Sequence, residues 1–369
     1  MAKIRNVGYK KFRKEVKDKK VVLWGAGRMA SSYLRTFCEG LDVVGIIDKD
    51  ERLWGTVLED NNIQYPVISE NDFLQRLNKN SELCWEISIF ITPTCYAGEI
   101  IKHINRFSSY DSIDCYVGVL MRDYYEPSTC TFTEGTPKIP KKIHYCWFGG
   151  KEIPDSLKRY METWHRFCPD YEIIRWDESN YDITKNRYMR EAYECLKWGF
   201  VPDYARLDII YNEGGVYLDT DVELVSSLDR LLNDEMFCGF SCNFQIAMGL
   251  GFGAIKEHFL IKSLRDYYDE LSFYLPNGNM NLKMCNEYQN PVFRRFGFEL
   301  ENRFQKKNGV VVYPSEVLSP DSGFFYKNYS ANTIAVHHFE SSWASESEKK
   351  AMNELKRELA DKSIYIETR

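Results

Sequence analysis

The chain has 369 residues, 44% of them hydrophobic, which is an ordinary globular composition and long enough for two domains. Its formal net charge of −6 argues against nucleic acid as a partner. No apolar run approaches the roughly 20 residues that cross a bilayer, and the start of the chain lacks the apolar core of a secretion signal. We therefore expect a cytoplasmic protein, and we interpret its eleven scattered cysteines as reduced thiols.

The first 20 residues are strongly basic. They hold nine Lys or Arg against two acidic residues, a local charge of +7, so the rest of the chain carries −13. Two interpretations stay open. The segment is either a solvated first helix or a peripheral contact with an anionic membrane surface, which would place the protein at the inner face of the membrane.

The next segment has the pattern of a βαβ unit. A buried strand at residues 20–24 leads into Gly25-Ala26-Gly27 and a helical run, and a second strand ends at Asp48. A Gly-x-Gly turn followed by an acidic residue is typical of Rossmann-type folds, because glycines let backbone amides approach a phosphate. With further strands at 87–92 and 116–120, we expect a small Rossmann-like domain over residues 1–130. Gly25, Gly27 and Asp48 either bind a nucleotide or form only a tight turn.

Turn-forming residues at 131–137 predict a linker, and a second α/β domain is expected over residues 138–369. Its expected strands lie at residues 143–147, 171–176, 237–240, 247–253, 313–318 and 335–339. Its expected helices lie at residues 154–167, 188–197, 258–274 and 345–361, with one more that begins at Asp203 and ends before Gly214.

An Asp-x-Asp follows this last helix. The run from Gly214 to Glu223 is apolar at Val216 and Leu218, so we expect an extended segment. Alternation along a strand would then point Tyr217, Asp219 and Asp221 to one side. Two carboxylates on one face can share a hard divalent cation. Taken alone, the pattern is better explained by a polar strand end with a solvated turn.

The helix before it carries a second charged pair. Asp203 and Arg206 are three positions apart and therefore share a helix face. Asp203 could be only an N-cap, and Arg206 only half of a surface ion pair.

Together with three other motifs, this run resembles glycosyltransferase family 32. The four motifs, in order, are residues 139–150, 169–177, 203–221 and 337–343. That family includes capsular-polysaccharide transferases and fungal mannosyltransferases, and it is distantly similar to the glucosylating domain of clostridial toxins. The resemblance implies a GT-A type nucleotide-sugar transferase domain preceded by the Rossmann-like domain.

The resemblance also implies an activity. A metal-dependent, retaining hexosyltransferase would move a hexose from a nucleoside-diphosphate sugar, expected to be a UDP-sugar, to a saccharide or a lipid-linked saccharide. Surface or capsular polysaccharide synthesis is the expected setting. We expect the residues that select the sugar in the loops at 241–248 and 277–289.

Site residues follow from the matched motifs. Mn²⁺ or Mg²⁺ would be held by Asp221 and His338, with Asp219 near the ribose and the water shell of the metal; His337 stays open as the ligand in place of His338. A carboxylate and imidazole set suits Mn²⁺. Asp203 would accept hydrogen bonds from the hydroxyls of the donor sugar, and Arg206 would hold Asp203 or the diphosphate. The remaining donor-binding residues implied by the resemblance are Trp147 and Tyr217, at the base and ribose, and Ser341 and Trp343, at the phosphates.

Three alternatives were weighed. An NAD(P)-dependent sugar-nucleotide oxidoreductase or epimerase would use Gly25 and Gly27, but residues 1–130 contain no Tyr-x-x-x-Lys pair, and the Asp-x-Asp would be unexplained. A binding module with a decayed enzyme domain is disfavoured because every motif position is intact. A transferase that acts on a protein acceptor stays open.

Overall fold

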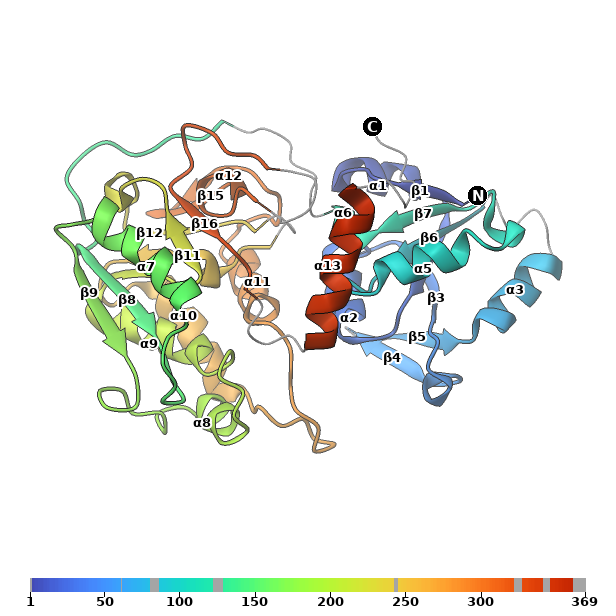
Figure 1. Ribbon diagram of the computed structural model, residues 1–369, viewed down its shortest axis with the longest axis horizontal. Coiled ribbons are helices and arrows are strands. Elements are labelled where there is room, and N and C mark those ends of the chain that lie inside the picture. Colours follow the sequence, from blue (N-terminus) through green and yellow to red (C-terminus); the bar gives the residue numbers. More distant parts are fainter. Residues whose placement is uncertain are drawn as a thin grey trace. The chain divides into compact units, whose positions relative to one another are not determined.

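The chain folds into two compact α/β units in the computed structural model, labelled in Figure 1. The structure describes residues 2–60, 62–79, 86–121, 129–241, 245–321, 327–340 and 346–360. One unit comprises Met1–Tyr124 with Ala344–Arg369, and the other comprises Tyr125–Trp343. The predicted α/β fold class is confirmed, because each unit is organised around its own seven-stranded sheet.

The first unit is a nearly all-parallel sheet in the order β1-β7-β6-β2-β3-β5-β4, with only β4 antiparallel to its neighbour. Its strands are β1 (Lys3–Arg5), β2 (Lys20–Trp24), β3 (Asp42–Ile47), β4 (Val57–Asp60), β5 (Ile63–Ile68), β6 (Ile87–Ile91) and β7 (Asp114–Val117). Its helices are α1 (Tyr9–Glu15), α2 (Arg28–Thr36), α3 (Glu70–Lys79), α5 (Ala97–Ile104), α6 (Gly118–Met121) and α13 (Glu346–Ala360). The apolar strands are buried, as parallel strands between helices must be.

The last helix of the chain belongs to this first unit. Helix α13 packs beside α5, and Lys102 of α5 is paired with Glu358 of α13 (Figure 1). The sequence expectation had assigned residues 138–369 to the second domain. The difference arises because α13 is amphipathic, and its buried Leu355 and Leu359 could cover either core.

The glycine-rich turn after β2 is held by contacts within the chain. Gly25 has a φ of +106°, and a Cβ there would lie 2.5 Å from the Pro93 ring. Asp48 accepts a hydrogen bond from the Ala26 amide at 2.6 Å and another from the Asp50 amide at 2.8 Å. Gly25 and Asp48 therefore each have a structural role in the turn, and nucleotide binding by Gly25, Gly27 and Asp48 stays a prediction.

The second unit contains a mixed sheet in the order β14-β15-β12-β13-β10-β8-β9 and a two-stranded sheet, β11-β16. The strands are β8 (Lys142–Cys146), β9 (Glu172–Trp176), β10 (Gly215–Tyr217), β11 (Val222–Leu224), β12 (Met236–Gly239), β13 (Phe252–Ala254), β14 (Gln305–Lys307), β15 (Val310–Tyr313) and β16 (Ala335–His337). Strands β9, β8 and β10 run parallel, so their carboxyl ends meet at one edge of the sheet.

Helices cover both faces of this sheet. They are α7 (Asp155–Phe167), α8 (Arg187–Glu194), α9 (Pro202–Glu213), α10 (Phe259–Tyr267), α11 (Cys285–Arg295) and α12 (Ser315–Leu318). Alternate strand residues enter two cores: Tyr217 packs with α8 to α11, whereas Val216 packs with Trp164 of α7. Residues 313–318, expected as a strand, instead end β15 and form α12, because Pro314 precedes the first helical residue and cannot donate to a sheet.

A buried histidine fixes the start of β10 against β8. His144 lies in β8, and its Nε2 bonds the Gly214 carbonyl at 2.9 Å while the Trp176 indole N–H donates to its Nδ1 at 3.0 Å. A Cβ on Gly215 would lie 3.0 Å from that Nε2, and the φ of Gly215 is +101°. This packing sets where the chain leaves α9, and therefore where the Asp-x-Asp after β10 lies.

This histidine should make stability depend on pH. Burial lowers the pKa of His144 from 6.5 to about 4. Between pH 7 and pH 5 the unfolded chain therefore takes up a proton that the folded chain refuses, and the free energy of unfolding should fall by about 2 kcal/mol on account of His144. In urea unfolding of His144→Gln, the free energy of unfolding should therefore fall less between pH 7 and pH 5 than it does in the wild type. His165→Gln, on the exposed side of α7, is the control and should keep the wild-type difference.

Candidate active site

The Asp-x-Asp forms a turn at the carboxyl edge of the mixed sheet. Strand β10 ends at Tyr217, the Val222 amide donates to the Asp219 carbonyl at 3.1 Å, and β11 begins at Val222. The expected continuous extended run is therefore wrong. The chain must turn here because β10 belongs to the mixed sheet and β11 to the two-stranded sheet. The turn brings both carboxylates together, at the edge where open α/β sheets bind ligands.

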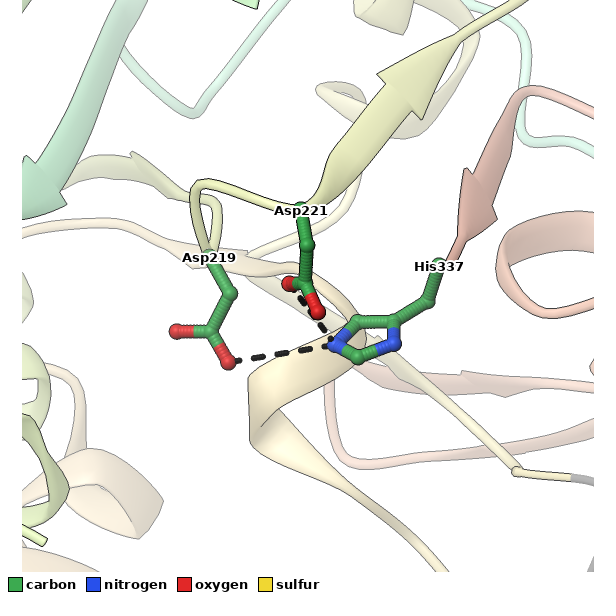
Figure 2. Close-up of side chains that lie close together, drawn as sticks. All are labelled: Asp219, Asp221 and His337. Atoms are coloured by element: carbon green, nitrogen blue, oxygen red, sulfur yellow. Dashed lines mark ion pairs between the residues drawn. The ribbon is translucent and has the colours of Figure 1, made fainter. Parts of the chain in front are cut away.

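A histidine from the far end of the chain completes this cluster. Strand β16 pairs antiparallel with β11 and sets His337 opposite Val222. The His337 Nε2 lies 3.3 Å from an oxygen of Asp221 and 3.9 Å from an oxygen of Asp219 (Figure 2). One ligand atom from each of the three residues lies within 4.8 Å of the others.

The neighbouring histidine is directed elsewhere. His338 lies 2.8 Å from a carboxylate oxygen of Glu223, and its ring stacks on Tyr160 with centroids 4.0 Å apart. Successive residues of an extended chain point to opposite sides, so only one of the two histidines can face Asp221. His337 therefore faces Asp221, and His338, which the resemblance implied as the ligand, lies outside the cluster; that His337 is the metal ligand stays a prediction.

Arg206 connects this cluster to Asp203. Both residues are on α9 and only 4% exposed, and the guanidinium donates to Asp203 at 3.1 Å and to the Pro202 carbonyl at 3.1 Å. Its other nitrogen lies 3.6 Å from Asp219, and its carbon lies 5.2 Å from the centre of the Tyr217 ring. Arg206 is therefore not half of a surface ion pair, because it is buried. Asp203 is not the N-cap of α9, because that position is Val201.

Burial and mutual charge shape the acidity of these groups. Burial raises the pKa of Asp203 to about 7, with Asp219 adding to the rise and Arg206 opposing it. Burial also acts upward on Asp219, but Arg206 and His337 hold its pKa below the ordinary value. For His337 burial acts downward, yet the two carboxylates raise its pKa. The site thus concentrates negative charge beside one arginine.

These three side chains fit a divalent cation. Two carboxylate oxygens and one imidazole nitrogen converge from three positions, which is a donor set suited to Mn²⁺. The Glu340 amide also donates to Asp221 at 3.1 Å, which orients that carboxylate as an outer partner of a metal ligand would.

Gly249 is a site residue that the sequence analysis missed. It lies in the short 3-10 helix Met248–Leu250, and a Cβ there would lie 2.8 Å from Asp219 Oδ2 and 3.0 Å from Arg206 Nη1. The backbone can approach the Arg206–Asp219 pair this closely only without a side chain. The alternating glycines at 249, 251 and 253 were the signal available in the sequence.

The other predicted donor residues lie in different environments. Trp147 follows β8 at the same sheet edge, is half-buried, and donates its indole N–H to the Lys151 carbonyl at 2.6 Å. Tyr217 is 1% exposed and its ring packs against the guanidinium of Arg206. It therefore supports the Asp203–Arg206 pair and does not line an open nucleotide-binding surface. Ser341 and Trp343 lie outside the described residues.

The matched region of known proteins covers the Asp203 helix and the Asp-x-Asp. Residues 154–238 match the family described as the glycosyltransferase sugar-binding region containing the DXD motif. The predicted resemblance to DXD glycosyltransferases is confirmed over this segment of the chain. The domain that carries it has a mixed α/β sheet, as expected for the predicted GT-A type.

Several curated proteins are similar over part of their length. Inositol phosphoceramide mannosyltransferase 3 of Schizosaccharomyces pombe is 32% identical over 106 residues, which is 28% of this chain and 30% of that protein. Mannosyl phosphorylinositol ceramide synthase SUR1 of Saccharomyces cerevisiae is 30% identical over 142 residues, 37% of each chain. The chain thus spans about a third of the length of these relatives.

A solved structure titled PaToxG glycosyltransferase aligns with a TM-score of 0.35 and 15% identity, over 43% of this chain and 70% of that one. Within the described residues, no helix combines the length and apolar character needed to span a membrane.

We predict that Gly249→Ala reduces the rate of nucleotide-sugar hydrolysis about tenfold or more, because the added methyl must displace Asp219 or Arg206. The melting temperature should change little, since both side chains can move. Gly297→Ala provides the opposite pattern. That glycine has a φ of +83° and only an ordinary 3.5 Å contact at Lys307, so the variant should lose stability but keep activity per folded molecule. Normal hydrolysis by Gly249→Ala would mean that the close approach is unimportant.

Proposed function

We propose that this protein is a metal-dependent glycosyltransferase that moves a hexose from a nucleoside-diphosphate sugar to an acceptor. One observation carries the proposal: Arg206 joins Asp203, on the side expected for the sugar, to Asp219 of the carboxylate–imidazole cluster. A donor of this type has a sugar next to a charged diphosphate. Asp203 would bind the sugar, and a metal ion held by the carboxylate–imidazole cluster would bind the diphosphate.

The chemistry divides between the two halves of the arrangement. When bound by Asp219, Asp221 and His337, a divalent cation would offset the negative charge that grows on the departing diphosphate. Asp203 would accept hydrogen bonds from sugar hydroxyls, and Arg206 would hold Asp203 in place through its buried ion pair. Retention of the anomeric configuration, with the leaving phosphate taking the proton of the acceptor, is part of the proposal and rests on the family resemblance.

Donor and acceptor are proposed at the level of chemical class. A UDP-sugar is our expected donor, and GDP-mannose is its main competitor because two similar proteins are named for mannosyl transfer. The same names specify ceramide-linked acceptors, which supports a saccharide on a lipid carrier as the acceptor here. We place this reaction in surface or capsular polysaccharide synthesis, at the cytoplasmic face of a membrane.

A basic N-terminal segment supports the membrane contact. Lys11, Lys14 and Lys17 are exposed, while Lys19 is paired with Asp114 at 2.8 Å. The protein should therefore sediment with phosphatidylserine vesicles at low salt, and less at high salt, because exposed charges are screened. Replacing Lys11, Lys14 and Lys17 together with Gln should abolish sedimentation. Equal binding to neutral phosphatidylcholine vesicles would contradict an electrostatic contact.

The catalytic proposal is tested with three variants of the cluster. Released nucleotide is measured for UDP-glucose, UDP-galactose, UDP-N-acetylglucosamine and GDP-mannose in the presence of Mn²⁺, and Mn²⁺ affinity is measured by calorimetry. Asp221→Asn and His337→Ala should each weaken Mn²⁺ binding about tenfold or more and abolish hydrolysis. His338→Ala is the matched control, since that ring is turned toward Glu223 and should leave Mn²⁺ affinity unchanged.

Near-native turnover of Asp221→Asn at saturating Mn²⁺ would refute the metal assignment. If His338→Ala weakens Mn²⁺ binding and His337→Ala does not, His338 and not His337 is the metal ligand, and the β11–β16 register described above is wrong. Hydrolysis of none of the four nucleotide sugars by the wild type, with no binding of UDP or GDP, would count against the glycosyltransferase proposal as a whole.

A further inference from the structure

Helix α11 carries three buried amide side chains, an unusual number for one helix of a hydrophobic core. They are Asn286, Gln289 and Asn290, at 8%, 1% and 5% exposure. Two of them have local partners. The Asn290 side chain accepts from the Ile246 amide at 3.1 Å, and the Asn286 amide donates to the Gln245 side chain. These two hold the segment 245–246 against the helix.

Gln289 has no such partner. Within the part of the chain that the structure describes, neither its amide oxygen nor its amide nitrogen makes a hydrogen bond. A buried polar group left unpaired is destabilising, and Gln289 carries two such atoms. A purely structural position would be filled at lower cost by Leu or Met. Gln289 therefore has the character of a binding residue.

Helix α11 lies beside the segment that leads to the active site, because its Asn290 holds Ile246, three residues before Gly249. Cys285 lies four positions before Gln289, so the two residues occupy adjacent turns of one helix face, whereas Asn286 and Asn290 occupy another. Burial raises the pKa of the Cys285 thiol to about 12, and among charged groups Asp203, Arg206 and Asp219 act on it. Gln289 thus follows, by one turn, a residue whose pKa is influenced by Asp203 and Arg206.

Two tyrosines carry further buried polar atoms without hydrogen-bond partners in the described part of the chain. Tyr188 and Tyr268 are fully buried, with ring centroids 5.4 Å apart, and their hydroxyls also lack partners among the described residues. Burial raises the pKa of both phenols well above 10, and Asp203 is the charge that adds most to the rise. The Tyr268 ring centroid lies 6.5 Å from that of Tyr204, the residue after Asp203, so these unpaired hydroxyls belong to the core beside α9.

A hexose is the chemical class that suits these groups. Each hydroxyl both donates and accepts, and an amide presents one acceptor and one donor side by side, so it can pair with two neighbouring hydroxyls. When ionised, Asp203 only accepts, and so can bind hydroxyls but cannot by itself test the orientation of a neighbouring pair. We propose that Gln289 binds two adjacent hydroxyls of the donor hexose and thereby determines which sugar is used. This inference rests on the proposed glycosyltransferase function.

The test is Gln289→Met, which keeps the length of the side chain and removes its polar atoms. The wild type is first ranked on UDP-glucose, UDP-galactose, UDP-N-acetylglucosamine and GDP-mannose by kcat/KM of hydrolysis. The variant should lose about tenfold or more on the best donor, because a hydrogen-bonded pair is lost. Its preference for that sugar over the second-best sugar should shrink. Its affinity for UDP or GDP with Mn²⁺ should be unchanged, and its melting temperature should stay equal or rise.

Gln305→Met is the matched control. Gln305 is 5% exposed, but its amide donates to the Glu299 carbonyl at 2.8 Å and accepts from the Glu299 amide at 2.9 Å. That variant should lose stability and keep the ranking of donors. If Gln289→Met folds poorly, Gln289→Glu keeps the length and the acceptor oxygens, removes the donor, and should still shift the ranking.

The outcomes separate the inference from the proposal on which it rests. Failure of the wild type to bind or hydrolyse any of the four donors defeats both. A wild type that hydrolyses one donor, with Gln289 variants that keep its kcat/KM and its ranking, overturns the inference alone. Equal losses for the sugar nucleotide and for free UDP or GDP would also overturn it, because they would assign Gln289 to the nucleotide or to general packing.

Discussion

The ion pair that Arg206 makes with Asp203 is the constraint on which the rest of the site depends. A buried guanidinium is tolerated only if carboxylates and carbonyls surround it, and here Asp203, Asp219 and the Pro202 carbonyl supply them. Because Arg206 lies between the two aspartates, the position of Asp203, the proposed sugar-binding group, is tied to that of the proposed metal site. Gly249 keeps the space on which this bridge depends, since a side chain there would meet both Arg206 and Asp219.

A two-stranded sheet brings the third side chain to the carboxylate–imidazole cluster. Strand β16 returns to β11 more than a hundred residues after the Asp-x-Asp, and the antiparallel register sets His337 beside Asp221. The same register bonds the His338 amide to the Asp221 carbonyl, so the backbone and the side chain of Asp221 are both held by the late segment. An error of one residue in this pairing would exchange the two histidines, which explains why their roles differ so sharply.

The protein keeps several buried polar atoms unpaired near Asp203 while pairing most others nearby. Asn186, for example, caps α8 and also donates to the Tyr268 carbonyl, and Glu191 accepts from Ser272 and the Phe273 amide. The polar side chains Asn186 and Glu191, at the edge of the apolar core between α8, α10 and α11, therefore have hydrogen-bond partners. Unpaired atoms such as those of Gln289 are consistent with a pocket preorganised for a polyhydroxylated ligand, because groups fixed in advance need no reordering when it binds.

The sequence alone determined the α/β class, most helices of the second unit, the pairing of Asp203 with Arg206, and the importance of Asp219 and Asp221. These features depend on local signals, namely helix stops, apolar periodicity and the spacing of charges along a few turns. It could not decide between His337 and His338, because their environment is set by a register formed with a strand far away in the chain. It also misplaced the Asp-x-Asp on a continuous extended run, overlooked Gly249, and assigned α13 to the second domain. In each case the deciding contact joins segments distant in sequence, so only the tertiary structure could specify it.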